Sequence, residues 1–319
     1  MILALAGGVG AARMLRGLVA AAGGEPITAV VNTGDDTVLH GLHISPDLDT
    51  VTYTLAGAIN PDTGWGLAGE SWAAMGALDR YGGQTWFRLG DQDLATHLYR
   101  TQRLLDGVGL AQTTAEIARS WGVKVRLLPM TEDPVRTMMT LAGPDAESGR
   151  SEIGFQDYFV RRGHDVAVSA VRFDGAPQAR PAPGVLDAVS GAEVLVVCPS
   201  NPVVSIGPIL AVPGMADALA ARREATVAVS PIVAGAAIKG PADRLMTELG
   251  HEASVVGVAR LYAAFVRALV IDEVDAHLAG AVEKEGLTAI VAPTVMSTPE
   301  RGAQLARAVL DAATGPGAR

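Results

Sequence analysis

The chain opens with Met1-Ile-Leu-Ala-Leu-Ala-Gly7-Gly8-Val9-Gly10-Ala-Ala-Arg13, the stretch that says most about its fold. An apolar strand runs straight into a glycine turn, and an Ala/Leu-rich helix follows. Glycines let the backbone turn tightly and approach a phosphate, while the free N–H groups at the start of the helix favour an anion. The stretch predicts a nucleotide-binding fold, and the alternative is a tight turn that holds no ligand.

The glycine turn matches no standard nucleotide motif completely. Gly8 and Gly10 supply the first two glycines of a G-x-G-x-x-G dinucleotide motif, but Arg13 stands at the third. The P-loop pattern G-x-x-x-x-G-K-[ST] occurs nowhere in the sequence. An NAD-dependent dehydrogenase is therefore disfavoured, and so is a P-loop protein.

Composition narrows the class of protein further. The 319 residues are 49% hydrophobic and 18% charged, as in a compact globular protein. A formal net charge of −9 leaves no general basic surface for nucleic acid or an anionic membrane. The single cysteine, Cys198, cannot form an internal disulfide and lies beside an apolar run, so we expect an inert thiol in a cytoplasmic protein.

Short β-branched runs alternate with longer Ala/Leu/Arg segments along the chain. This alternation predicts an α/β fold, a Rossmann-like, doubly wound and mainly parallel sheet within one interrupted domain spanning 1–319. We expect a helical layer at about 50–120, beside the ligand edge of the sheet, and a smaller helical block at about 241–287. The strands are expected near 2–6, 27–32, 123–127, 166–172, 193–198, 225–229 and 288–291.

Carboxylates follow the second predicted strand and continue for some distance. Five aspartates fall between Asp35 and Asp62, where ligands of open α/β sheets bind. This oxygen-rich group suits Mg²⁺, which prefers one or two carboxylates, waters and substrate phosphates. The structural alternatives are an Asx turn at Asp35-Asp36 and a helix cap at Asp47 or Asp49.

Two further segments carry polar groups that suit a ligand. Arg88 stands between aromatic residues and a Gly-Asp turn, where its planar guanidinium can contact a phosphate or a carbonyl. Its alternative role is a surface arginine that covers a helix end. Ser200 and Asn201 follow another predicted strand and offer donors for a second part of a nucleotide.

Taken together, these motifs resemble the 2-phospho-L-lactate transferases of coenzyme F(420) biosynthesis and their actinobacterial phosphoenolpyruvate transferase relatives. The matching motifs are spread in order from residue 1 to about 245. They are Gly7-Gly8-Val9-Gly10, Asn32-Thr33-Gly34-Asp35-Asp36, the segment His40–Thr50, Gly64-Trp65-Gly66, Phe87-Arg88-Leu89-Gly90-Asp91, Pro129-Met130-Thr131, the segment Phe155–Val160 and Pro199-Ser200-Asn201-Pro202.

The resemblance implies a Mg²⁺-dependent transferase. The donor would be a guanosine diphosphate ester of lactate or enolpyruvate, and the acceptor 7,8-didemethyl-8-hydroxy-5-deazariboflavin. The acceptor's terminal ribityl hydroxyl would attack the phosphorus that bears the three-carbon acid, and GMP would leave. The motifs leave the choice between the two acids open, and the apolar helical blocks make a homodimer the expected assembly.

The resemblance also assigns residues. Asp49 would contact the ribityl hydroxyl and serve as base, and Trp65 and Arg88 would join it in binding the deazaflavin acceptor. The residues implied for the nucleotide are Gly8, Val9, Gly10, Asn32, Ser200 and Asn201. Those implied for the metal are Asp35, Asp49 and Asp62. A second functional reading is a non-catalytic regulatory protein that binds a nucleotide sugar on the same kind of fold.

Overall fold

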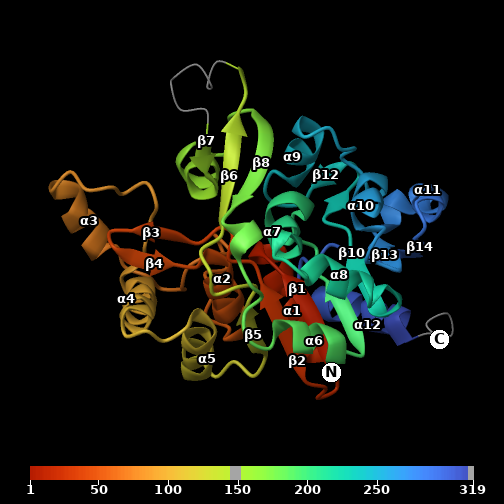
Figure 1. The fold of residues 1–319 in the computed structure, drawn as a ribbon, viewed down its shortest axis with the longest axis horizontal. Coiled ribbons are helices and arrows are strands. Elements are labelled where there is room, and N and C mark those ends of the chain that lie inside the picture. The colour runs from red at the N-terminus through yellow and green to blue at the C-terminus, as the bar shows by residue number, and fades with distance from the viewer. Residues whose placement is uncertain (144–151, 315–319) are drawn as a thin grey trace.

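The computed structural model describes residues 1–143 and 152–314. Its centre is a seven-stranded sheet in the order β14-β13-β10-β9-β1-β2-β5, in which every neighbouring pair is parallel (Figure 1). The strands are β1 Ile2–Ala6, β2 Ile27–Val31, β5 Arg126–Pro129, β9 Val194–Val197, β10 Thr226–Val229, β13 Ala268–Ile271 and β14 Thr288–Val291.

The strands are mostly apolar because helices cover both faces of the sheet. Successive side chains of β1 alternate between the two faces, so Leu3 and Leu5 pack into one core and Ile2, Ala4 and Ala6 into the other. The first core receives helices α6 Val185–Gly191, α7 Gly207–Ala211, α8 Met215–Ala220, α9 Ala242–Glu248, α10 Val255–Tyr262 and α11 Ala279–Lys284. The second receives α1 Gly8–Ala21, α2 Pro46–Leu55, α5 Leu110–Ser120 and α12 Pro299–Thr314.

The connections create a switch point beside β1. The chain adds β2 and β5 on one side of β1, then returns to β9 on the other side and continues outward to β14. The loops that follow β1 and β9 therefore diverge at the carboxyl edge of the sheet. Open α/β sheets bind their ligands in such a crevice.

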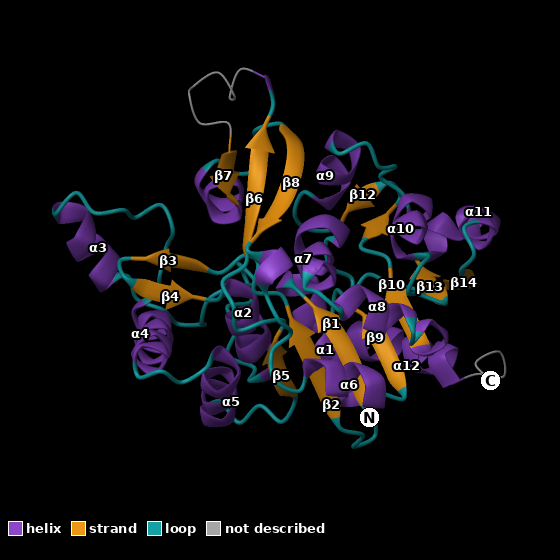
Figure 2. Cartoon of the chain, viewed as in Figure 1, coloured by secondary structure: helices purple, strands orange, loops and turns teal. Residues whose placement is uncertain are grey.

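Smaller elements stand outside this sheet (Figure 2). A hairpin of β3 and β4, together with α3 and α4, extends from one side, and a three-stranded antiparallel sheet in the order β7-β6-β8 rises above the carboxyl edge. The bounds are β3 Thr37–Leu39, β4 Leu42–Ile44, α3 Ala73–Arg80, α4 Asp91–Leu105, β6 Arg136–Leu141, β7 Glu152–Gly154, β8 Val168–Asp174, β11 Ile232–Val233 and β12 Ala236–Ala237.

The doubly wound parallel sheet is confirmed, but two expectations about its parts were wrong. The strand expected near 166–172 exists as β8, but it pairs antiparallel with β6 in the smaller sheet, and several of its side chains are exposed, unlike those of the central strands. The block at about 241–287 is not purely helical, since it contains β13, which is fully buried inside the main sheet. Helix α10 ends at Tyr262, and the apolar run that continues to Leu269 changes from helix to strand.

Two other observations concern the chain as a whole. Cys198 is fully buried at the end of β9, and burial raises the pKa of its thiol, as expected for an inert core residue. Within the described ranges, no helix is both long and apolar enough to cross a membrane.

Candidate functional site

A cavity of about 530 Å³ lies where the loops after β1 and β9 diverge. Its wall includes the glycine turn, the start of α2, part of α4, the segment after β7, and the loops near residues 200, 239 and 296. Of the residues predicted for the site, Gly8, Val9, Gly10, Asp35, Asp49, Trp65, Arg88, Ser200 and Asn201 line it. The structure therefore brings most of the predicted residues to one place.

The glycine turn is built against the loop that follows β9. Ser200 Oγ accepts a hydrogen bond from Gly7 N at 3.3 Å and donates one to Gly7 O at 2.9 Å. A Cβ atom at Gly10 would overlap the main-chain oxygen of Pro199, so only glycine permits this packing. Gly8, with φ of +73°, starts α1. The free end of α1 thus faces the cavity between the two loops.

A buried amide connects the carboxylates beneath this turn. Asn32 Nδ2 donates to Asp35 Oδ2 at 3.1 Å and to Asp47 Oδ2 at 3.0 Å, while Asp47 Oδ1 accepts from Gly8 N at 2.9 Å. Asn32 itself is fully buried and is not part of the cavity wall. It was predicted to bind the nucleotide, but the structure places it under the site, where it holds two aspartates that do line the cavity.

Burial disfavours the charged form of these aspartates. It raises the pKa of Asp47 to about 6 and the pKa of Asp35 well above its usual range, and the neighbouring Asp47 carboxyl raises that of Asp35 further. Asp35 Oδ1 is buried and has no hydrogen-bond partner among the described residues. Asp35 as a residue lines the cavity, and its carboxyl can hold a proton or contact a cation there.

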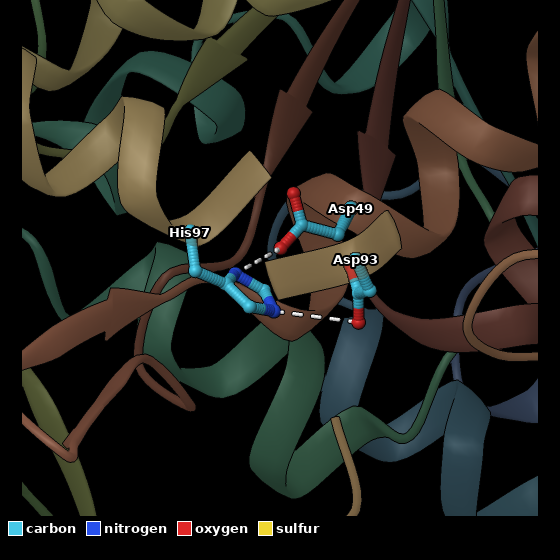
Figure 3. A group of neighbouring side chains, drawn as sticks. All are labelled: Asp49, Asp93 and His97. Atoms are coloured by element: carbon cyan, nitrogen blue, oxygen red, sulfur yellow. Dashed lines mark ion pairs between the residues drawn. The ribbon is translucent and has the colours of Figure 1, made fainter. Parts of the chain in front are cut away.

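Asp49 belongs to a second buried group, which joins α2 to α4. One terminal nitrogen of Arg100 donates a hydrogen bond to Asp49 Oδ2 at 3.1 Å, and the other donates one to Asp49 Oδ1. His97 lies between two carboxylates, with Nδ1 3.7 Å from Asp49 Oδ2 and Nε2 3.3 Å from Asp93 Oδ2 (Figure 3). Residues three and four apart share a helix face, so α4 presents Asp93, His97 and Arg100 together.

Hydrogen bonds compensate for the burial of Asp93. Tyr53 donates its hydroxyl to Asp93 Oδ1 at 2.7 Å. Burial alone would raise the pKa of Asp93, but the contact with His97 and the Tyr53 bond outweigh it and hold the pKa below its usual value. The charged form of Asp93 is therefore stabilised in the folded protein.

The three aspartates predicted as metal ligands do not lie together in the structure. One ligand atom each from Asp49, Asp93 and His97 lie within 4.8 Å of one another, close enough for one ion. Asp35 lies instead with Asp47, and Asp62 is exposed in a turn outside the cavity wall. Asp93 and His97 were not predicted as site residues, although their i, i+4 spacing in the sequence is typical of a shared helix face.

The cavity wall also carries aromatic and basic groups. The Trp65 side chain is 45% exposed, and the Arg88 guanidinium lies 4.2 Å from the ring centroid of Trp72. Lys239 Nζ donates to Thr63 O at 2.7 Å, next to the turn that carries Trp65. Burial, aided by the charge of Arg13, lowers the pKa of Lys239. The cavity is thus lined by carboxylates together with basic and aromatic groups.

Comparisons with known proteins agree with this architecture. The family described as 2-phospho-L-lactate transferase CofD matches residues 2–297. A phosphoenolpyruvate transferase of Kitasatospora aureofaciens is 45% identical over 312 residues, with 97% of this chain and 96% of that protein covered. One from Mycolicibacterium smegmatis is 39% identical, with 98% of each covered. A solved structure from Bacillus halodurans shares the fold, with a TM-score of 0.61, 15% identity, and coverage of 97% and 98%.

Proposed function

We propose a specific reaction for this chain, which belongs to the 2-phospho-L-lactate transferase CofD family of coenzyme F(420) biosynthesis. It moves a phospholactyl or phosphoenolpyruvyl group from a guanosine diphosphate-activated donor to 7,8-didemethyl-8-hydroxy-5-deazariboflavin. GMP is released, and coenzyme F(420)-0 or its dehydro form is made. The observation that carries the proposal is the cavity itself, whose wall brings together the glycine turn at the start of α1, buried carboxylates and aromatic side chains.

The chain's own residues supply positioning and charge. The backbone from Gly8 to Gly10 and the Ser200-Asn201 turn hold the donor's phosphates, because both turns face one cavity. Asp49 orients the acceptor's ribityl hydroxyl and takes its proton as that oxygen bonds to phosphorus and the bond from phosphorus to GMP breaks. The two-point contact of Arg100 fixes the plane of the Asp49 carboxylate.

The donor set also fits a magnesium ion. Mg²⁺ needs only one or two protein carboxylates when substrate phosphates are present, and Asp49 or Asp35, which both line the cavity, would supply one. Bound there, the ion would neutralise the diphosphate of the donor. We expect EDTA to abolish turnover and excess Mg²⁺ to restore it. Full turnover in the chelator, measured as GMP release, would remove the metal from the proposal.

The deciding experiment supplies both substrates. The purified protein is mixed with the deazaflavin acceptor, Mg²⁺ and either the lactate or the enolpyruvate guanylated donor, and GMP and the product mass are followed. We expect both signals with at least one donor, and the better donor identifies the acid. A protein that binds the nucleotide but yields neither signal with either donor would be a binding protein of this fold and not a transferase.

We also propose that two copies form a homodimer. Sedimentation equilibrium then gives about twice the 32.8 kDa mass of one chain. A monomer mass at the enzyme concentration used for the assay would contradict this part of the proposal and leave the reaction untouched.

A further inference from the structure

Two phenylalanines of the segment after β7 form a stacked pair on the cavity wall. Phe155 and Phe159 have ring centroids 5.3 Å apart and planes inclined by 14°. His164 stacks on Phe159 at 5.2 Å and 19°. Both phenylalanines line the cavity and remain partly exposed. Aromatic surface left bare inside a cavity of this size is a binding surface for another flat ring.

The pair is held rigidly from behind. Gln156 Nε2 donates to the main-chain oxygen of Asp35 at 3.0 Å, which ties the segment to the carboxylate turn. Tyr158 is fully buried beneath it. Phe159 lies in η2, a π-helical turn over Asp157–Arg161, and such turns are frequent at functional sites. A ring that is already fixed loses little conformational freedom when a ligand stacks on it.

The position of the pair connects it with both predicted substrate segments. On one side, Phe155 and Phe159 pack against an apolar cluster that includes Val204, and the N–H of Val204 donates to the side chain of Asn201. On the other side, Phe155 shares a second cavity of about 280 Å³ with Trp86, two residues before Arg88. The pair therefore shares one cavity wall with the turn assigned to the nucleotide and the segment assigned to the acceptor.

We propose that Phe155 and Phe159 form a stacking platform for the fused heterocyclic ring of one substrate. This inference rests on the proposed function, whose substrates both carry such a ring, guanine in the donor and deazaflavin in the acceptor. The platform contributes binding affinity and ring orientation. The main-chain donors and carboxylates contact the phosphate and hydroxyl groups instead.

The test removes one ring while keeping apolar bulk. Phe159→Leu and Phe155→Leu delete a ring, and Phe159→Tyr keeps it; dissociation constants for GDP and for the deazaflavin acceptor are measured separately by calorimetry. We expect the leucine variants to weaken one ligand about ten- to a hundredfold, as when a stacked base loses its aromatic partner, and the tyrosine variant to stay within about twofold. Phe265→Leu, at an aromatic pair within the core and not part of the cavity wall, is the matched control for general loosening.

Each outcome of this experiment either supports the stacking platform or overturns it. Weakening confined to GDP assigns it to guanine, and weakening confined to the acceptor assigns it to the deazaflavin. Three results would each overturn the stacking platform. They are unchanged binding in the leucine variants, equal weakening of both ligands, and equal weakening in Phe159→Tyr and Phe159→Leu. The proposed reaction is tested independently of the platform. It would be refuted by a wild-type protein that binds its ligands but shows no turnover. A wild-type protein that binds neither ligand would refute both proposals.

Discussion

Asp49 is the residue on which the proposed chemistry depends most, and its partner lies on a different helix. Arg100 is 2% exposed and contacts both oxygens of the Asp49 carboxylate. Removing one member of a buried ion pair leaves an uncompensated charge and costs about 3–5 kcal/mol. A loss of activity after a change at Asp49 can therefore have two causes, loss of chemistry and loss of stability.

A charge-balanced pair of variants separates these causes. We expect Asp49→Asn to lower turnover about a hundredfold or more, the usual contribution of a general base, and to lower the unfolding temperature as well. The double variant Asp49→Asn with Arg100→Gln removes both charges, so it recovers much of the unfolding temperature but not the turnover. Steady-state GMP release and thermal unfolding are measured on both. Recovery of turnover in the double variant would show that Asp49 is structural.

Residue types predicted part of this site, and tertiary packing supplied the rest. The glycine turn, Ser200 and Asp49 were recognisable because strand ends followed by small or acidic residues are local patterns. Arg100 was not recognisable, since a charged residue within a helix is usually exposed. Its burial depends on where α2 lies against α4, and no local pattern in either helix encodes that contact.

At the scale of elements, the crossing of α1 and α12 depends on two small residues. A Cβ atom at Gly17 would overlap the main-chain oxygen of Gly302 on α12, so the helices approach with backbone against backbone. The glycine carries no positive φ, and its role here is close approach and not backbone freedom. The first helix, which begins the phosphate site, is fixed by this contact with the last helix.

The variant Gly17→Ala tests this contact. We expect the free energy of unfolding to fall by about 1–3 kcal/mol, because the added methyl forces the two helices apart. Gly280→Ala in α11 is the matched control, since a Cβ there meets no atom within 4 Å and alanine favours a helix. Urea unfolding of both variants is the measurement. Equal stabilities for Gly17→Ala and wild type would mean that the crossing is loosely packed.

The main sheet was predictable from the sequence wherever a strand stands as an isolated apolar run, as β1, β2 and β9 do. The residues of β13 follow the apolar end of α10 after a short turn, so periodicity could not separate strand from helix there. The short strands of the side hairpin and the small sheet carry mixed polar and apolar residues, and their pairing is set by tertiary contacts.

At the scale of the whole molecule, carboxyl groups lie in the interior as well as on the surface. The chain carries a net charge of −9, and burial raises the pKa of Asp35, Asp36 and Asp47 together. A carboxyl whose pKa is higher in the folded than in the unfolded chain binds its proton more tightly when folded. Protonation therefore stabilises the fold, and that stabilisation is lost as the pH rises through the folded-state pKa.

This sign predicts the pH dependence of stability. The pKa of Asp47 is raised from 3.8 to about 6. Its contribution to the free energy of unfolding is therefore about 1 kcal/mol more stabilising at pH 5 than at pH 7. We expect Asp47→Asn to remove that part of the difference, while Asp174→Asn, at an exposed ion pair, leaves it unchanged. Urea unfolding at both pH values measures it. An Asp47→Asn protein with wild-type pH dependence would contradict the raised pKa.

The bond between Ser200 and Gly7 has a consequence for the growing polypeptide. It joins groups 193 residues apart, and β9 pairs with β1 across a similar interval. A nascent chain that has not yet emerged from the ribosome as far as Ser200 has only one of the two turns that bound the cavity. The apolar side of α1 must wait still longer, until α12 is synthesised. During translation, this enzyme therefore presents an unfinished core whose N-terminal half needs protection from aggregation.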